Sequence, residues 1–159
     1  MAISKDEFRA ALARFPSGVT VVTTKDATGR FHGITVSAFT SVSLEPPMIL
    51  VCIEKKTGSH DAFQESEFFV VNMLAEGQEN LSNRFASQLN DKFDGALYRL
   101  GIGEIPVLED AFVTLECRLA YAHEGGDHTI FVGLIEKSNV KDENPLVYWD
   151  GNYRQLEID

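Results

Sequence analysis

The sequence has few cysteines, few basic residues and no long apolar run, and each shortage excludes a class of protein. Its two cysteines, Cys52 and Cys117, form no Cys-x-x-Cys pair, so both are predicted to be reduced core residues. Fourteen Lys and Arg against 24 Asp and Glu give a formal net charge of −10, which disfavours binding to nucleic acid or to an anionic membrane. The densest apolar run, 48–53, is far shorter than the roughly 18 residues of a membrane span. We therefore expect a cytoplasmic protein.

What the sequence does contain is typical of a globular domain. Its 159 residues suggest one domain, 1–159, and 44% hydrophobic with 24% charged residues excludes a disordered or fibrous chain. No internal repeat or linker divides it.

The first segment predicts a helix. Ser4 and Glu7 form a capping-box pattern, and Phe8, Leu12 and Phe15 recur at helical spacing before a Pro-Ser-Gly stop. Alone such a helix is marginal, so its apolar stripe must dock on a partner surface. Strands are then predicted at 19–24, 31–37, 48–54, 68–74, 112–121 and 128–135. Short helices are predicted at 59–64 and 78–86.

The late strand 112–121 has the strongest β pattern. Apolar residues from Val113 to Tyr121 alternate with polar ones such as Glu116, which predicts one buried and one exposed face. Because the helices do not alternate with the strands, antiparallel pairing is favoured. We expect a mainly β protein, a barrel with a few flanking helices.

Familiar catalytic motifs are absent. Gly101 and Gly103 do not open a dinucleotide fingerprint, since Pro106 stands where its third glycine belongs. The spacing of His123 and His128 is not that of a familiar metal site, so no metal is expected.

Three polar segments remain as candidates for binding. The segment 35–41 carries small hydroxyl residues that expose backbone to a flat heteroaromatic, or it is a solvated strand edge. The segment 55–60 combines two lysines, hydroxyls and a glycine at a predicted helix start, which suits a phosphate; a solvated turn has equal standing. The corner 125–128 presents His128, either to a ligand or to the turn itself.

Together these segments resemble the flavin reductase family, the reductase components of two-component monooxygenases. The resemblance spans residues 8–156. Its carriers, in chain order, are FRAALARFPSGVTVVTT, GITVSAFTSVSLEPPMILVCIEKKTGSH, FFVVNML, NRFAS with the later DKF, GGDHTIFVGLIE and PLVYWDGNY.

The resemblance implies a fold, a reaction and partners. The fold is an antiparallel Greek-key split β-barrel, forming a homodimer with flavin near the subunit interface. The reaction is hydride transfer from NADH, with NADPH possible, to FAD or FMN, and the reduced flavin diffuses to a partner oxygenase. An alternative is a flavin-binding electron carrier that does not oxidise nicotinamide directly.

The resemblance also implies which residues bind. The flavin ring is expected to meet Thr35, Val36, Ser37, Ala38, Phe39 and Ser41. The ribityl chain and phosphate are expected to meet Cys52, Ile53, Glu54, Lys55, Lys56, Thr57 and Ser59. Further flavin contacts are expected from Arg84, Phe85 and Ala86. His128 is expected to orient the nicotinamide nucleotide, with neighbours Tyr148, Trp149, Gly151 and Tyr153.

Overall fold

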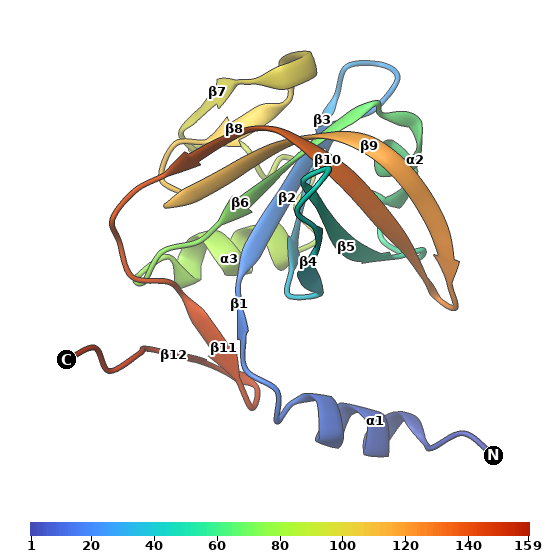
Figure 1. Cartoon of the computed structure of the whole chain (residues 1–159), viewed down its shortest axis with the longest axis vertical. Coiled ribbons are helices and arrows are strands. Elements are labelled where there is room, and N and C mark those ends of the chain that lie inside the picture. The colour runs from blue at the N-terminus through green and yellow to red at the C-terminus, as the bar shows by residue number, and fades with distance from the viewer.

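The computed structural model describes residues 1–159, and strands dominate it (Figure 1), which confirms the mainly β class. The strands are β1 (Ser17–Gly18), β2 (Thr20–Lys25), β3 (Phe31–Val36), β4 (Phe39–Ser43), β5 (Met48–Glu54), β6 (Phe68–Met73), β7 (Tyr98–Leu100), β8 (Pro106–Leu108), β9 (Val113–Gly125), β10 (His128–Val140), β11 (Val147–Trp149) and β12 (Asn152–Arg154). The helices are α1 (Lys5–Leu12), α2 (His60–Glu65), α3 (Glu79–Ala86) and the 3₁₀ turn η1 (Ile102–Glu104). None of these helices has the length and hydropathy needed to cross a bilayer.

The main sheet has seven strands in the order β3-β2-β6-β9-β10-β5-β4. All its neighbouring pairs are antiparallel, as predicted. Its edge strands β3 and β4 do not pair with each other, so hydrogen bonding does not close the sheet into a ring. Two small sheets, β1-β11-β12 and β7-β8, flank it.

The core is divided between the two sides of this sheet. One cluster gathers Val51, Phe63 and Phe131, so α2 packs on that side. A second cluster gathers Val21 and Phe85, so α3 packs on the other. Burial on both sides explains why β6 reads as a continuous apolar run rather than an alternating one.

Several predicted elements are confirmed. The helix α1 begins at Ser4 with both hydrogen bonds of the capping box, and β5 has the predicted bounds 48–54. The hairpin of β2 and β3 turns at Asp26, whose carboxylate accepts hydrogen bonds from Thr28 and from the Arg30 backbone N–H. These bonds, the largest from the Thr28 hydroxyl, hold the pKa of Asp26 well below its usual range.

The predicted alternation along 112–121 is wrong. Thr114 and Glu116 are as buried as Leu115 and Cys117, and Tyr121 is exposed. Glu116 is covered by the segment that joins β7 and β8: it accepts a hydrogen bond from the Ile102 backbone N–H and pairs with Arg99 at 3.2 Å. A second layer over one half of β9 therefore buries both faces there, while the far half runs past the end of β6 and pairs with β10 alone.

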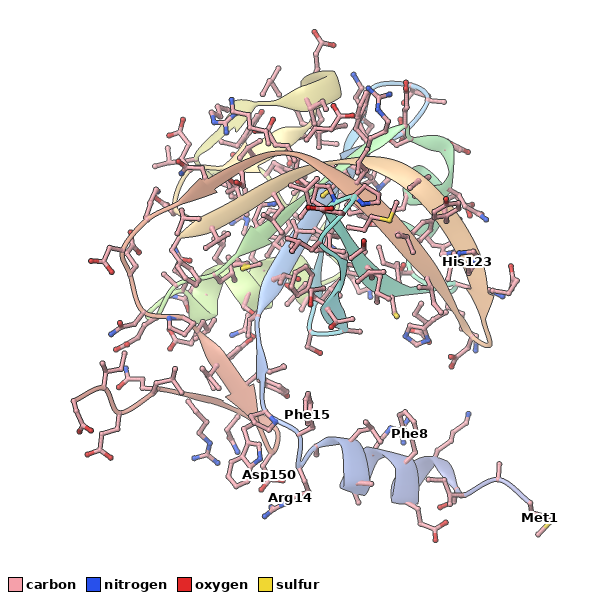
Figure 2. All side chains as sticks on the ribbon, viewed as in Figure 1. Met1, Phe8, Arg14, Phe15, His123 and Asp150 are labelled. Atoms are coloured by element: carbon pink, nitrogen blue, oxygen red, sulfur yellow. The ribbon has the colours of Figure 1, made fainter.

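The helix α1 stands apart from the sheet (Figures 1 and 2). No residue of it is buried. The chain holds its end through polar contacts with β11 and the following turn: Asp150 N–H donates to Ala13 at 3.0 Å, the Trp149 indole donates to the Arg14 carbonyl at 3.0 Å, and Arg14 pairs with Asp150.

Candidate functional site

The strand β5 brings the three polar segments together. On one side it pairs with β4, where Phe39 faces Val51. On the other side it pairs with β10, where His128 faces Glu54. The turn 55–59 follows at its end. Three segments that lie far apart in the sequence therefore meet along the last residues of one strand.

The segment 35–41 forms the corner between β3 and β4. The Ala38 carbonyl accepts a hydrogen bond from the Cys52 backbone N–H at 3.0 Å, and the Thr35 hydroxyl donates to the Ser82 carbonyl at 2.5 Å. Ser37 and Ala38 are exposed, whereas Val36 belongs to the core. The corner therefore exposes backbone and small side chains, and its contact with a ligand stays a prediction.

Side chains of β5 alternate between the core and the opposite face. Ile53 points into the core, so a ligand can meet it only through its backbone, while Cys52 and Glu54 lie on the opposite face. Burial raises the pKa of the Cys52 thiol. The thiol is therefore protonated at neutral pH and acts as a packing neighbour rather than as a nucleophile.

Lys55 and His128 share a corner. The Lys55 backbone N–H donates to the Asp127 carbonyl at 2.9 Å, and its ammonium pairs with Glu124. His128 Nδ1 lies 2.7 Å from the Asp127 carboxylate, and its side chain is 41% exposed. The carboxylate fixes Nδ1 as the donor nitrogen, which leaves Nε2 as the nitrogen available to a ligand.

Beyond this corner a cleft of about 790 Å³ opens. Its walls include Lys56, Thr57 and Ser59 from the turn after β5, and Phe85 and Ala86 from α3. The volume is within the range of small-molecule and cofactor sites. Five predicted contacts thus line one cavity, although Phe85 itself is fully buried behind its surface.

Arg84 lies beside the cleft but is engaged by the protein. Its guanidinium donates to the backbone carbonyls of Lys92 and Asp94. These bonds hold the loop 87–95, which walls the cleft. In this structure Arg84 shapes the cavity through that loop.

The C-terminal residues lie elsewhere in the chain. Tyr148, Trp149, Gly151 and Tyr153 belong to the β11–β12 hairpin, which Figure 1 shows apart from the tip of the β9–β10 hairpin that carries His128. The Tyr153 hydroxyl lies 2.8 Å from both the Ser82 hydroxyl and the Asn83 amide oxygen on α3. The guanidinium groups of Arg14 and Arg154 each lie over the Trp149 ring, 4.8 and 5.5 Å from its centroid. A single chain does not bring the tail and His128 together.

The sequence interpretation missed one wall of the cleft. Arg30 and His32 line it from the β2–β3 hairpin, and Lys92 lines it from the loop after α3. For Arg30 and His32 the sequence holds a signal that could have identified them. The Arg-Phe-His run at the start of a strand is a local concentration of cationic and aromatic groups in an acidic chain.

The donor set fits a flavin nucleotide. Backbone and hydroxyl groups at the 35–41 corner suit the polar edge of a flat ring, and Lys56 with the hydroxyls of Thr57 and Ser59 suits a phosphate. No group of three or more His, Cys, Asp or Glu side chains is placed to hold a metal ion.

Comparison with known proteins gives a consistent result. Residues 12–157 match the flavin reductase like domain. The reductase component of a 4-nitrophenol 4-monooxygenase/4-nitrocatechol 2-monooxygenase from Rhodococcus opacus is 40% identical over 95% of this chain and 80% of that protein. A probable flavin reductase of Rhizobium meliloti is 38% identical over 91% of this chain, which spans only 47% of that longer protein.

A solved structure resembles the whole fold. The NADH:FAD oxidoreductase of Streptomyces globisporus C-1027, determined in complex with NAD and FAD fragments, superposes with a TM-score of 0.92. It is 34% identical and covers 98% of this chain and 94% of its own.

Proposed function

Because the chain belongs to the flavin reductase family, we propose that it is an NADH-dependent flavin reductase that transfers a hydride from NADH to FAD or FMN. The observation that carries the proposal is the convergence, along β5, of the 35–41 corner, the turn 55–59 and His128, with residues 56–59 of that turn also lining a cofactor-sized cleft. The likeness to an NADH:FAD oxidoreductase over nearly the whole length of both chains supports it. NADPH is the alternative hydride donor.

The chain's residues act by binding and orienting. A bound flavin supplies the redox chemistry itself. The backbone of the 35–41 corner, which the Cys52 N–H ties to β5 through the Ala38 carbonyl, would face the ring edge, where N–H groups stabilise negative charge without a side-chain base. Lys56 and Ser59 hold the phosphate. His128, oriented by Asp127, positions the nicotinamide nucleotide over the ring, because hydride transfer requires the two rings in contact.

We propose a partner monooxygenase that receives the reduced flavin by diffusion. The name of the Rhodococcus opacus relative, a reductase component, supports this role. We also propose that the bent seven-stranded sheet is the split barrel of the family, and that residues 1–159 act as one domain.

A second copy of the chain is the proposed partner of α1. Phe8 on this helix and Phe15, three residues past its end, project to the same side (Figure 2), where they are 55% and 77% exposed. An eight-residue helix that buries nothing in its own chain needs an external surface for stability. A homodimer would supply that surface.

The proposed activity is tested by following NADH oxidation with and without added FAD or FMN. We expect a rate that depends on flavin; a protein that oxidises no NADH at any flavin concentration contradicts the proposal. Such a protein, if it bound flavin, would instead be an electron carrier.

The role of His128 is tested with His128→Asn. We expect the KM for NADH to rise about tenfold, the loss of one good hydrogen bond to the nucleotide, with a smaller change in kcat. The matched control is His123→Asn, an exposed histidine on the same hairpin that stacks on Tyr121. An unchanged KM in His128→Asn would rule out the orienting role.

A further inference from the structure

Most of the residues that line the cleft are not among those expected to hold the flavin. The turn 56–59 lines one part of it. The rest is lined by the β2–β3 hairpin, the loop 87–95 and Tyr98, none of which the proposed reaction uses. This second part has a floor and a rim of distinct chemistry.

The floor is an aromatic cluster. Phe31, Phe93 and Tyr98 meet pairwise in edge-to-face contacts with ring centroids 5.7 to 5.8 Å apart, and Phe85 supports Phe93 from below at 5.1 Å. Phe93 and Phe85 are buried, so the accessible surface belongs to Phe31, which is half-buried, and to Tyr98, which is 37% exposed. A planar base can stack on such a surface whatever its hydrogen-bonding pattern.

The rim is cationic. The lining contains Arg30, Lys56 and Lys92 against Asp91 and Asp94, an excess of one positive charge in a chain of net charge −10. The Lys92 ammonium donates to the Gly33 and Phe85 carbonyls, which leaves Arg30 and Lys56 as the cations for a ligand. Asp91 accepts hydrogen bonds from the Phe93 and Asp94 backbone N–H groups, so its charge is directed at its own loop.

Arg30 is held in place over the cleft. Asp26 fixes its backbone through the hairpin turn, and one guanidinium nitrogen donates to the Asn90 carbonyl at 2.9 Å. The other N–H groups of the guanidinium make no hydrogen bond within the chain, so they are available to an anion. The hairpin thus carries a positioned cation to the rim of an aromatic floor.

We propose that this part of the cleft is a subsite for the adenosine diphosphate end of a dinucleotide. Phe31 and Tyr98 receive the base, and Arg30 with Lys56 receives the phosphates. The inference rests on the proposed function, and it goes further by naming residues that discriminate FAD from FMN, or NADH from a mononucleotide. Both FAD and NADH carry this group, and FMN lacks it.

The first arm of the test compares dissociation constants for FAD and FMN, measured by flavin fluorescence. If FAD places its adenylate here, the wild-type protein binds FAD about tenfold more tightly than FMN, the gain expected from one stacked base. Arg30→Ala and Tyr98→Leu then reduce that ratio severalfold. Arg9→Ala, which removes the same charge from an exposed site on α1, keeps the wild-type ratio.

The second arm compares the KM values of NADH and of reduced nicotinamide mononucleotide, with FMN as the acceptor. If NADH supplies the adenylate, Arg30→Ala and Tyr98→Leu reduce this ratio instead, and the FAD to FMN ratio stays as in the wild type. A shift in either ratio supports the subsite and identifies its source.

The proposal is overturned if neither ratio differs between the two cleft variants and Arg9→Ala. That outcome is separate from failure of the proposed function, because wild-type NADH oxidation with FMN needs no adenylate on the flavin. A thermal melt of each variant, run beside both arms, shows whether the variant is folded. The two cleft variants change different positions, and Tyr98→Leu keeps an apolar side chain, so a folding defect in one does not remove the test.

Discussion

The helices α1 and α3 are of equal length and similar pattern, yet they have opposite environments. Each has eight residues with an apolar stripe. On α3 the stripe docks on the sheet, and Phe85 is fully buried. On α1 no residue of the stripe is buried in the chain, and Phe8 and Leu12 remain more than half exposed.

The difference lies in the surface that each helix meets. The sheet has a recess for α3 at Gly33, where a Cβ would lie 2.6 Å from the Phe85 ring. The Tyr153 hydroxyl, between Ser82 and Asn83, ties the same helix to the C-terminal hairpin. The helix α1 has only polar contacts at its end. An amphipathic stripe therefore indicates that a helix packs on some apolar surface. The stripe does not show whether that surface belongs to the same chain or to another one.

The largest expected effect tests the buried side of the comparison. Phe85→Ala removes a fully buried ring and leaves a cavity, so the free energy of unfolding should fall by about 3–5 kcal/mol. Urea denaturation followed by far-UV circular dichroism measures it.

The matched control for Phe85→Ala is Phe15→Ala, the same chemical change at a 77% exposed site next to α1. We expect the free energy of unfolding of the separated chain to change by no more than about 0.5 kcal/mol in the control, with both variants measured at a protein concentration low enough to dissociate a dimer. Equal losses in the two variants would mean that α1 also packs in its own chain.

A smaller effect is expected from filling the recess itself. Gly33→Ala places a methyl group against the Phe85 and Phe93 rings, and such overpacking typically costs about 1–3 kcal/mol. Gly18→Ala is the matched control, because a Cβ at Gly18 meets no atom within 4 Å. If Gly33→Ala is as stable as the wild type in urea, the close approach of α3 does not depend on the glycine.

Local sequence signals predicted the elements that depend on local causes. The capping box set the start of α1, and the apolar run after two prolines set β5. The strand β4 was missed, since its Phe-Thr-Ser-Val-Ser sequence is weakly apolar and becomes a strand by pairing with β5. The burial of Glu116 was missed for the same reason: it depends on Ile102 and Arg99, which only the fold brings to it.

The candidate site divides in the same way. The turn 55–59 and His128 were identified from residue type and resemblance, and the fold places them at one corner. The role of Arg84 in holding a loop could not be predicted, and the Arg-Phe-His run marks Arg30 as a candidate without showing that it reaches the cleft. Arg84 is placed by a hydrogen bond to the Asp94 backbone carbonyl, and Arg30 by one to the Asn90 backbone carbonyl. Neither pair has a regular spacing in the sequence. Carbonyl acceptors leave no mark on composition.

The smallest effect on the stability of the separated chain is expected from a substitution in the exposed stripe of α1. It is also the most direct test of the contrast between α1 and α3. Phe8→Asp should change the free energy of unfolding of the separated chain by no more than about 0.5 kcal/mol, because Phe8 is buried by nothing within it. It should nevertheless convert a dimer into a monomer, since a carboxylate cannot be buried unpaired at an interface. Sedimentation velocity measures the change.

The control for Phe8→Asp is Ala10→Asp, which adds the same charge on the opposite side of α1. We expect it to remain dimeric. A wild-type protein that sediments as a monomer at all concentrations contradicts a second copy as the partner of α1. A dimer that survives Phe8→Asp shows instead that another surface joins the subunits, and the contrast between α1 and α3 then needs a different explanation.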